Sequence, residues 1–175
     1  MKIHKQESVQ TRKIVLTIIA GVFLVIIYVM IFMFSSDTGE DSSAISEKVT
    51  KWLVGVYYKI FPVEGTGEAI TPVAYEWEGI VRKAAHFIEY MSIGFLSCGI
   101  AVMWMHRMKI MFAILMLQLF ISAGLDELHQ YFVPGRSASV RDVLLDVCGG
   151  TVGIIFLFIL YKIGKCVSRR KRRAL

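Results

Sequence analysis

The fold of this chain is indicated by an uncharged stretch, IVLTIIAGVFLVIIYVMIFMF, which runs from Ile14 to Phe34. A helix needs about 20 apolar residues to cross the hydrocarbon core of a bilayer. Three further apolar blocks of nearly this length cover residues 80–104, 110–125 and 143–161. We therefore predict an all-α integral membrane protein with four transmembrane helices, forming a single membrane domain over residues 1–175.

The composition agrees with a membrane protein rather than a soluble one. Hydrophobic residues make up 55% of the chain and charged residues 19%, against about 45–50% and about 25% in soluble domains. In a chain of 175 residues, four spans leave no room for a soluble catalytic domain. Any chemistry must therefore come from the helices and their connections.

The net charge of +6 is concentrated at the C-terminus, where seven of the 20 basic residues lie from Lys162 onward. A basic run just beyond a hydrophobic helix attracts anionic lipid headgroups. The run lacks the aromatic or glycine-rich pattern of an RNA-binding segment. We expect anionic lipids as partners of this tail and no nucleic acid, while oligomerisation is left open.

Basic residues also predict the orientation, since they favour the cytoplasmic side of membrane helices. They occur before Ile14, at Arg107 and Lys109, and in the C-terminal tail. We predict a multi-pass protein of the bacterial cytoplasmic membrane with both termini in the cytoplasm. The first block is longer than the core of a signal peptide and is read as an uncleaved helix.

Residues 35–79 would then face outward, as would residues 126–142. Apolar residues recur at helical spacing in the first of these segments: Ile45, Val49, Trp52, Leu53, Val56 and Tyr57. This pattern predicts an amphipathic helix in the outer interface. Residues 62–72, bounded by two prolines, are expected to be irregular.

Two glycines on the fourth predicted span indicate tight helix packing. Gly149 and Gly153 form a small-x-x-x-small pair, with Gly150 beside the first. Such pairs allow helix backbones to approach closely in membranes.

A polar segment, VRKAAHFIEY at residues 81–90, begins the second span. Arg82, His86 and Glu89 follow i, i+4, i+7 spacing and share a helix face, with Lys83 and Tyr90 close to it. Glu89 lies about two turns into the predicted helix, where an unpaired charge is costly. Two structural explanations compete with function: the cations reach lipid phosphates, or His86 and Glu89 form an interhelical hydrogen bond.

A second polar segment, GLDELHQYFVPGRSASVRD at residues 124–142, follows the third span. Asp126 shares a face with His129 and Gln130, and Asp142 shares one with Asp146. In the structural alternative, Asp142 caps a helix near Ser139 or Asp126 pairs with Arg141. So many ionisable groups at one end of a membrane protein favour a functional site. We predict one outer cavity that holds His86, Glu89, Asp126, His129, Arg136 and Asp142.

These two segments, with Phe34-Ser35-Ser36 after the first span, resemble the VanZ-like membrane protein family. The resemblance runs from Ile14 to about Tyr161. It implies an association with resistance to glycopeptide antibiotics, chiefly teicoplanin. It also implies kinship with membrane enzymes that act on lipid headgroups.

The leading hypothesis is an enzyme that transfers or hydrolyses an anionic lipid or lipid-linked headgroup at the outer face. A histidine would act as base or nucleophile, oriented by a carboxylate, while cations hold the phosphate. The catalytic candidates are His86, Glu89, Asp126, Glu127, His129 and Asp142. The substrate-binding candidates are Arg82, Lys83, Tyr90, Gln130, Arg136, Ser139 and Asp146.

Three alternatives remain. The same pocket would bind a lipid, a cell-wall precursor or the antibiotic without turnover. A divalent metal ion ranks lower, because no H-E-x-x-H or H-x-x-x-H spacing is present, so we expect no cofactor. Transport is disfavoured because the chain has no internal repeat or broken helix. The cysteines Cys98, Cys148 and Cys166 form no recognisable framework.

Overall fold

The computed structural model describes residues 2–61 and 66–173, which form five helices. These are α1 (Lys2–Ser36), α2 (Gly39–Ile60), α3 (Thr66–Trp104), α4 (Met108–Tyr131) and α5 (Val140–Arg173). No strand occurs in this described part of the chain. The predicted all-α fold is therefore confirmed.

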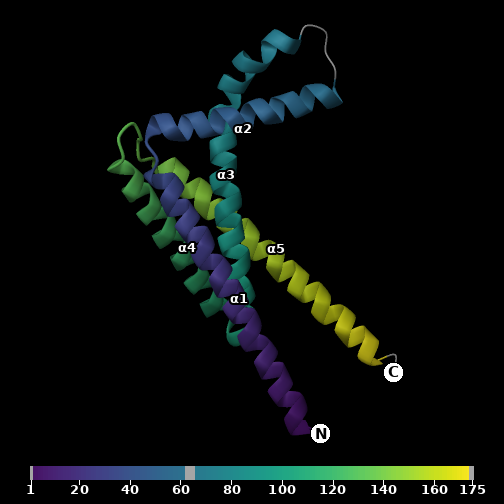
Figure 1. Cartoon of the computed structure of the whole chain (residues 1–175). Coiled ribbons are helices and arrows are strands. Elements are labelled where there is room, and N and C mark those ends of the chain that lie inside the picture. The colour runs from purple at the N-terminus through teal and green to yellow at the C-terminus, as the bar shows by residue number, and fades with distance from the viewer. Residues whose placement is uncertain (1, 62–65, 174–175) are drawn as a thin grey trace.

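Four of these helices contain segments long and apolar enough to cross a membrane: Gln6–Ser36, Val73–Trp104, Met108–Tyr131 and Val140–Arg170. Many of their large apolar side chains face outward, for example Phe23, Phe112 and Phe156. An apolar outer surface is what lipid contact requires. The chain is thus a multi-pass membrane protein. Both termini and the α3–α4 connection lie at one end, and α2 lies at the other (Figure 1).

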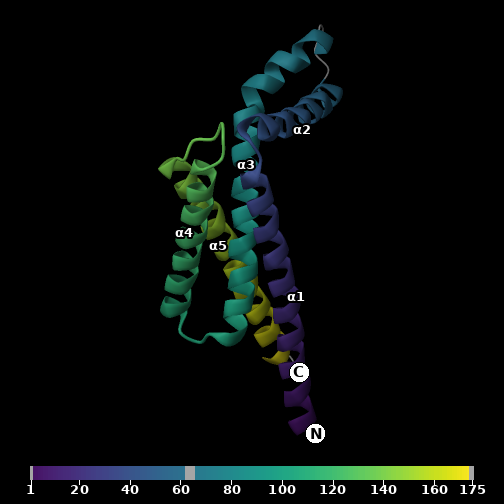
Figure 2. The same ribbon diagram turned by 60° about the vertical axis from the view of Figure 1, so that its left-hand side comes forward.

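The predicted amphipathic helix is α2, which crosses the end of the bundle and packs against α3 (Figures 1 and 2). Thr38 caps it by accepting a hydrogen bond from the backbone N–H of Asp41 at 3.2 Å. A stripe of mostly small residues is buried: Ser42, Ser46, Thr50 and Val54. The apolar residues of the predicted stripe, including Trp52 and Tyr57, remain exposed.

The helix that contains the second span extends beyond the predicted apolar block at its N-terminal end. Helix α3 begins at Thr66 rather than near Ile80, so the irregular segment predicted for residues 62–72 is helical from Thr66 onward. Residues 62–65 of that segment lie outside the described residues. Backbone hydrogen bonding continues a helix through polar sequence, and Ala74, fully buried, adds packing there. Glu89 is therefore more than two turns from the helix start.

Helices α3 and α5 are in close contact through glycines, which confirms the predicted packing role of Gly149 and Gly153. A Cβ atom at Gly149 would overlap the carbonyl oxygen of Phe87, and one at Gly153 would overlap that of Met91. Because Phe87 follows His86 and Gly149 follows Asp146 by one turn, this contact brings the two polar segments together.

Candidate functional site

A polar cavity lies where α3, α4 and α5 meet the α4–α5 connection, at the end of the molecule near α2 (Figure 1). Its volume is about 130 Å³, which is room for several water molecules. Charged and polar side chains from both predicted segments line it: Arg82, Lys83, His86, Glu127, Gln130, Arg136, Ser137, Asp142 and Asp146. The tertiary fold thus joins residues that are some 40 positions apart or more in the sequence.

A second cavity of about 160 Å³ lies beside the first, under α2. Its wall is largely apolar and includes Phe34, Ile45, Val49, Val81 and Ala85. Glu89 lines this second cavity. Three residues belong to both walls: Arg82, His86 and Arg136. A polar chamber and an apolar chamber are therefore separated by two cations and an imidazole.

Asp126 is buried between α4 and α1. Its Oδ1 accepts a hydrogen bond from the Ser35 hydroxyl at 2.6 Å, and its Oδ2 accepts one from the Gln130 amide at 3.0 Å. The same amide lies 3.3 Å from the Ser35 hydroxyl. Asp126 is therefore held by neutral donors, in place of the Arg141 partner considered from the sequence.

Arg136 fastens the α4–α5 connection to the end of α1. Its Nη2 donates to the Phe34 carbonyl at 2.6 Å and its Nε donates to the Asp37 carbonyl at 3.1 Å. Burial lowers the pKa of its guanidinium, but the usual value is so high that the group stays charged at neutral pH. A guanidinium has five N–H donors, so the remaining ones are free to serve a ligand in either cavity.

The tight contact between Gly39 and Gly135 supports this arrangement. Gly39 donates its backbone N–H to the Pro134 carbonyl at 3.1 Å. Gly135 has a φ of +75°, a conformation that favours glycine. Pro134 and Gly135 lie in the turn that follows α4, and this turn sets the position of Arg136.

The start of α5 contains two further predicted site residues. Asp142, in the first turn of α5, lies 3.1 Å from the Lys83 ammonium. Ser139 donates its backbone N–H to Glu127 at 2.5 Å and accepts a hydrogen bond from the Arg141 N–H at 3.2 Å. Ser139 and Glu127 thus stabilise the start of α5, whereas Asp142 joins α5 to α3.

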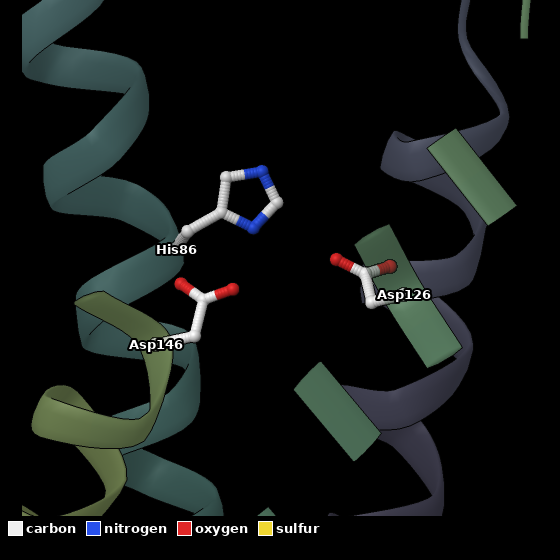
Figure 3. A group of neighbouring side chains, drawn as sticks. All are labelled: His86, Asp126 and Asp146. Atoms are coloured by element: carbon white, nitrogen blue, oxygen red, sulfur yellow. The ribbon is translucent and has the colours of Figure 1, made fainter. Parts of the chain in front are cut away.

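His86, Asp126 and Asp146 extend from three helices toward a common point (Figure 3). One potential ligand atom from each lies within 4.8 Å of the other two. His86 Nδ1 is 3.5 Å from Glu89 Oε2, too far for a good hydrogen bond. Among the described residues, the buried side-chain atoms without a hydrogen-bond partner are His86 Nδ1 and Asp146 Oδ1.

The structure divides the six residues that were predicted to share one cavity, so that prediction is wrong. His86, Arg136 and Asp142 line the polar cavity, Glu89 lines the second cavity, and Asp126 and His129 line neither. The His129 ring stacks on Phe32 with centroids 4.7 Å apart, and its Nε2 lies 3.0 Å from the Ser36 hydroxyl. It lines a third cavity, beside α1, with Asp126 and the buried Tyr90. Asp126 thus lies between His129 on one side and His86 on the other.

Ser35 and Ser36 contact the site but received no role from the sequence. Their signal was weak: two hydroxyl residues directly after an apolar stretch, in a motif that resembled a known family. The carbonyl groups of Phe34 and Asp37 gave no signal at all, because backbone acceptors are the same for every residue type.

A family model, VanZ/LLP1, matches residues 20–161. The chain belongs to the VanZ/LLP1 family. The match covers both polar segments, the whole candidate spans of α3 and α4, and parts of those of α1 and α5, so the predicted family resemblance is confirmed. No match was found among curated proteins or solved structures.

At the opposite end from the polar cavity, this VanZ/LLP1 protein has a basic cavity of about 750 Å³. Helix α5 continues through the basic segment to Arg173. The cationic side chains that line the cavity are Lys13, Lys162, Lys165 and Arg169. The ammonium groups of Lys162 and Lys165 lie over the rings of Phe158 and Tyr161. This end has the charge that anionic headgroups require.

Proposed function

We propose that the protein is an enzyme that transfers or hydrolyses the headgroup of a phosphorylated lipid or lipid-linked precursor. The reaction would take place at the extracytoplasmic face of the bacterial cytoplasmic membrane, with both termini in the cytoplasm. The observation that carries this proposal is the pair of adjacent cavities, one polar and one apolar, which share three wall residues. A phosphorylated lipid has the same two parts, a charged headgroup and an apolar chain.

The cations at the boundary between the cavities suit a phosphate. Arg82 and Arg136 line both cavities, and Lys83 lines the polar one. A guanidinium binds phosphate through two parallel hydrogen bonds. The two backbone carbonyls that hold Arg136 fix its position before a ligand arrives, which is the preorganisation that favours electrostatic stabilisation of a reacting phosphate.

His86 is the histidine on which we expect turnover to depend, because it lies in both cavity walls. An imidazole beside a bound phosphate can accept a proton, attack phosphorus, or hold a metal ion that activates water. His129, stacked on Phe32 and close to Ser36, supports the junction of α1 and α4 instead.

The family's association with glycopeptide resistance fits such an activity. A change in lipid headgroups or lipid-linked precursors in the outer leaflet would alter the surface that a lipid-bearing glycopeptide such as teicoplanin meets. We therefore include teicoplanin resistance in the proposal as the expected phenotype.

The test is turnover of a labelled mixture of anionic phospholipids by the purified full-length chain in nanodiscs, followed by mass spectrometry. His86→Ala should lower conversion by about 10²–10⁴-fold, the usual effect of losing an acid–base group, and should leave lipid binding largely intact. The matched control is His106→Ala, since His106 is exposed at the opposite end of the molecule.

Two outcomes would contradict the enzyme proposal. One is wild-type protein that binds a phosphorylated lipid but converts none of the lipids supplied. The other is an His86→Ala variant with full conversion. In the first case the site would be a binding module for a lipid, a precursor or the antibiotic, and the resistance phenotype would depend on sequestration.

A further inference from the structure

Asp146 is an unusual carboxylate for a membrane helix. Only 3% of its surface is exposed, and its Oδ1 has no hydrogen-bond partner. A buried carboxylate without partners is strongly disfavoured. The residue lies one turn before Gly149, where α5 is pressed against α3. In its ionised form such a group needs a cation or a donor.

The His86 ring beside Asp146 also has an unsatisfied nitrogen. His86 Nδ1 is buried and makes no hydrogen bond, with Glu89 Oε2 at 3.5 Å from it, and one nitrogen of this ring belongs to the group of ligand atoms that lie within 4.8 Å of one another. Figure 3 shows the carboxylates of Asp146 and Asp126 directed toward the His86 ring, from helices α5, α4 and α3. Two buried polar atoms from distant parts of the chain therefore point to one missing partner.

The third member, Asp126, is already oriented. Ser35 and Gln130 donate to its two oxygens at 2.6 and 3.0 Å. A carboxylate has about four acceptor positions, so these bonds leave room for a ligand. A metal-binding carboxylate is usually held in position by hydrogen bonds of this kind, from residues that do not themselves bind the metal ion.

We propose that His86, Asp126 and Asp146 bind one divalent transition metal ion, Zn²⁺ or Mn²⁺. Imidazole favours Zn²⁺, and carboxylates favour Mn²⁺. Three protein ligands with a further open position are typical of catalytic zinc sites. His86 and Asp146 also line the polar cavity, so the open position would face water or a headgroup.

The size of the group permits this ion after small rotations. Ligand atoms around tetrahedral Zn²⁺ lie about 3.4 Å apart, given metal–ligand distances of about 2.1 Å. The present separations of up to 4.8 Å must therefore shrink by about 1.4 Å at most. We expect side-chain rotations to provide this change.

The charge around the cavities also suits a divalent cation. Five carboxylates line the two cavities, namely Asp37, Glu89, Glu127, Asp142 and Asp146, and Asp126 lies beside His86; the cations that line the cavities are Arg82, Lys83 and Arg136. Lys83 is paired with Asp142, and Arg136 donates to backbone carbonyls. A divalent ion at the trio offsets the excess of negative charge.

This inference concerns binding of the metal ion and does not depend on turnover of a lipid. If the protein both binds this ion and converts a lipid, His86 would be a metal ligand, and the bound ion would activate water or polarise the phosphate. A metal ion ranked low in the sequence analysis because these three ligands come from three helices and form no local spacing motif.

The test uses full-length protein in detergent, stripped with a chelator, then dialysed against Zn²⁺ alone or Mn²⁺ alone, without added lipid. Metal content is measured by mass spectrometry and affinity by chelator competition. We expect one ion per wild-type chain. Asp146→Asn preserves the shape of the side chain but removes its charge. It should weaken metal binding by about 10–100-fold or more, because substitution of residues that only support a metal ligand already causes losses of this size. Asp37→Asn removes a charge from the neighbouring cavity and should leave binding unchanged.

Two results would overturn the site. One is wild-type protein that binds no more Zn²⁺ or Mn²⁺ than Asp146→Asn does. The other is equal loss in Asp37→Asn, which would indicate diffuse attraction by acidic residues. His86→Gln provides a second ligand variant if Asp146→Asn does not fold, as judged by circular dichroism and gel filtration. Since no lipid is present, failure of the lipid proposal would leave these results unaffected.

Discussion

Ser35 donates a hydrogen bond to Asp126 with 2.6 Å between the two oxygens, although the residues are 91 positions apart. Ser35 is fully buried and Asp126 nearly so. The bond connects the end of α1 to α4 and orients a carboxylate of the proposed metal site. One hydroxyl thus contributes to both the packing of the bundle and the geometry of the site.

Ser35→Ala should therefore affect both properties. Loss of a buried hydrogen bond to a charged group destabilises a protein by about 1.5–3 kcal/mol, and loss of an outer-shell contact weakens metal binding by about 10–100-fold. The measurements are detergent unfolding and chelator competition. Ser92→Ala is the control, because that hydroxyl donates only to the Ile88 carbonyl of its own helix. Equal behaviour of the two variants would show that the Ser35 bond is dispensable.

Gly94→Ala should destabilise the contact of α3 with α5. Its Cβ would overlap the carbonyl oxygen of Gly150, and overpacking of this kind costs about 1–3 kcal/mol. Gly124→Ala in α4 is the control, since no atom lies within 4 Å of its Cβ position. There the higher helix propensity of alanine should stabilise the helix by up to about 1 kcal/mol. Unfolding in denaturing detergent measures both, and destabilisation of equal size would contradict the prediction.

Arg136→Lys should lower both stability and lipid binding, although the charge is kept. A lysine cannot reproduce the two bonds to the Phe34 and Asp37 carbonyls, because it lacks the planar fork of donors. Hydrogen bonds from charged groups contribute about 1.5–3 kcal/mol. Arg141→Lys is the matched control, as Arg141 is exposed and its backbone N–H makes the contact with Ser139. If Arg136→Lys had the same stability as the wild type, Arg136 would contribute through its charge alone and not through its two hydrogen bonds to backbone carbonyls.

The predicted orientation can be tested by cysteine labelling of intact cells with a membrane-impermeant maleimide. Ile45→Cys and Ala138→Cys introduce thiols at exposed positions of the polar end, and each should react without permeabilisation. Native Cys166 is exposed at the opposite end and should react only after permeabilisation, so it provides an internal control. The reverse pattern would place the polar site in the cytoplasm.

The basic cavity should retain anionic lipid. Simultaneous Lys162→Gln, Lys165→Gln and Arg169→Gln changes remove three of its cations, each worth about 1 kcal/mol near an anionic surface. Native mass spectrometry from mixed anionic and zwitterionic micelles should show a lower share of bound anionic lipid. The control replaces Lys48, Lys51 and Lys59 of α2, at the other end, with glutamine. Equal loss in both variants would indicate an effect of net charge alone.

The sequence by itself determined the number and type of the membrane helices. A long apolar segment indicates a membrane helix, because backbone polar groups buried in lipid must form hydrogen bonds and only a helix forms them within one segment. It also determined that Gly149 and Gly153 face another helix, because their spacing places both on one side of α5. The start of α3 at Thr66 could not be predicted in this way, since the first turns of that helix carry no apolar pattern.

Only the tertiary structure decided which polar residues meet. Helical spacing placed Asp126 and His129 on one face of α4, but it did not specify which neighbouring helix that face would contact. Contact with α1 directs His129 onto Phe32 and Ser36, while the glycine contact of α3 with α5 brings His86 to Asp146. Periodicity is a local property of the backbone, whereas the partner of each face depends on packing between segments far apart in the chain.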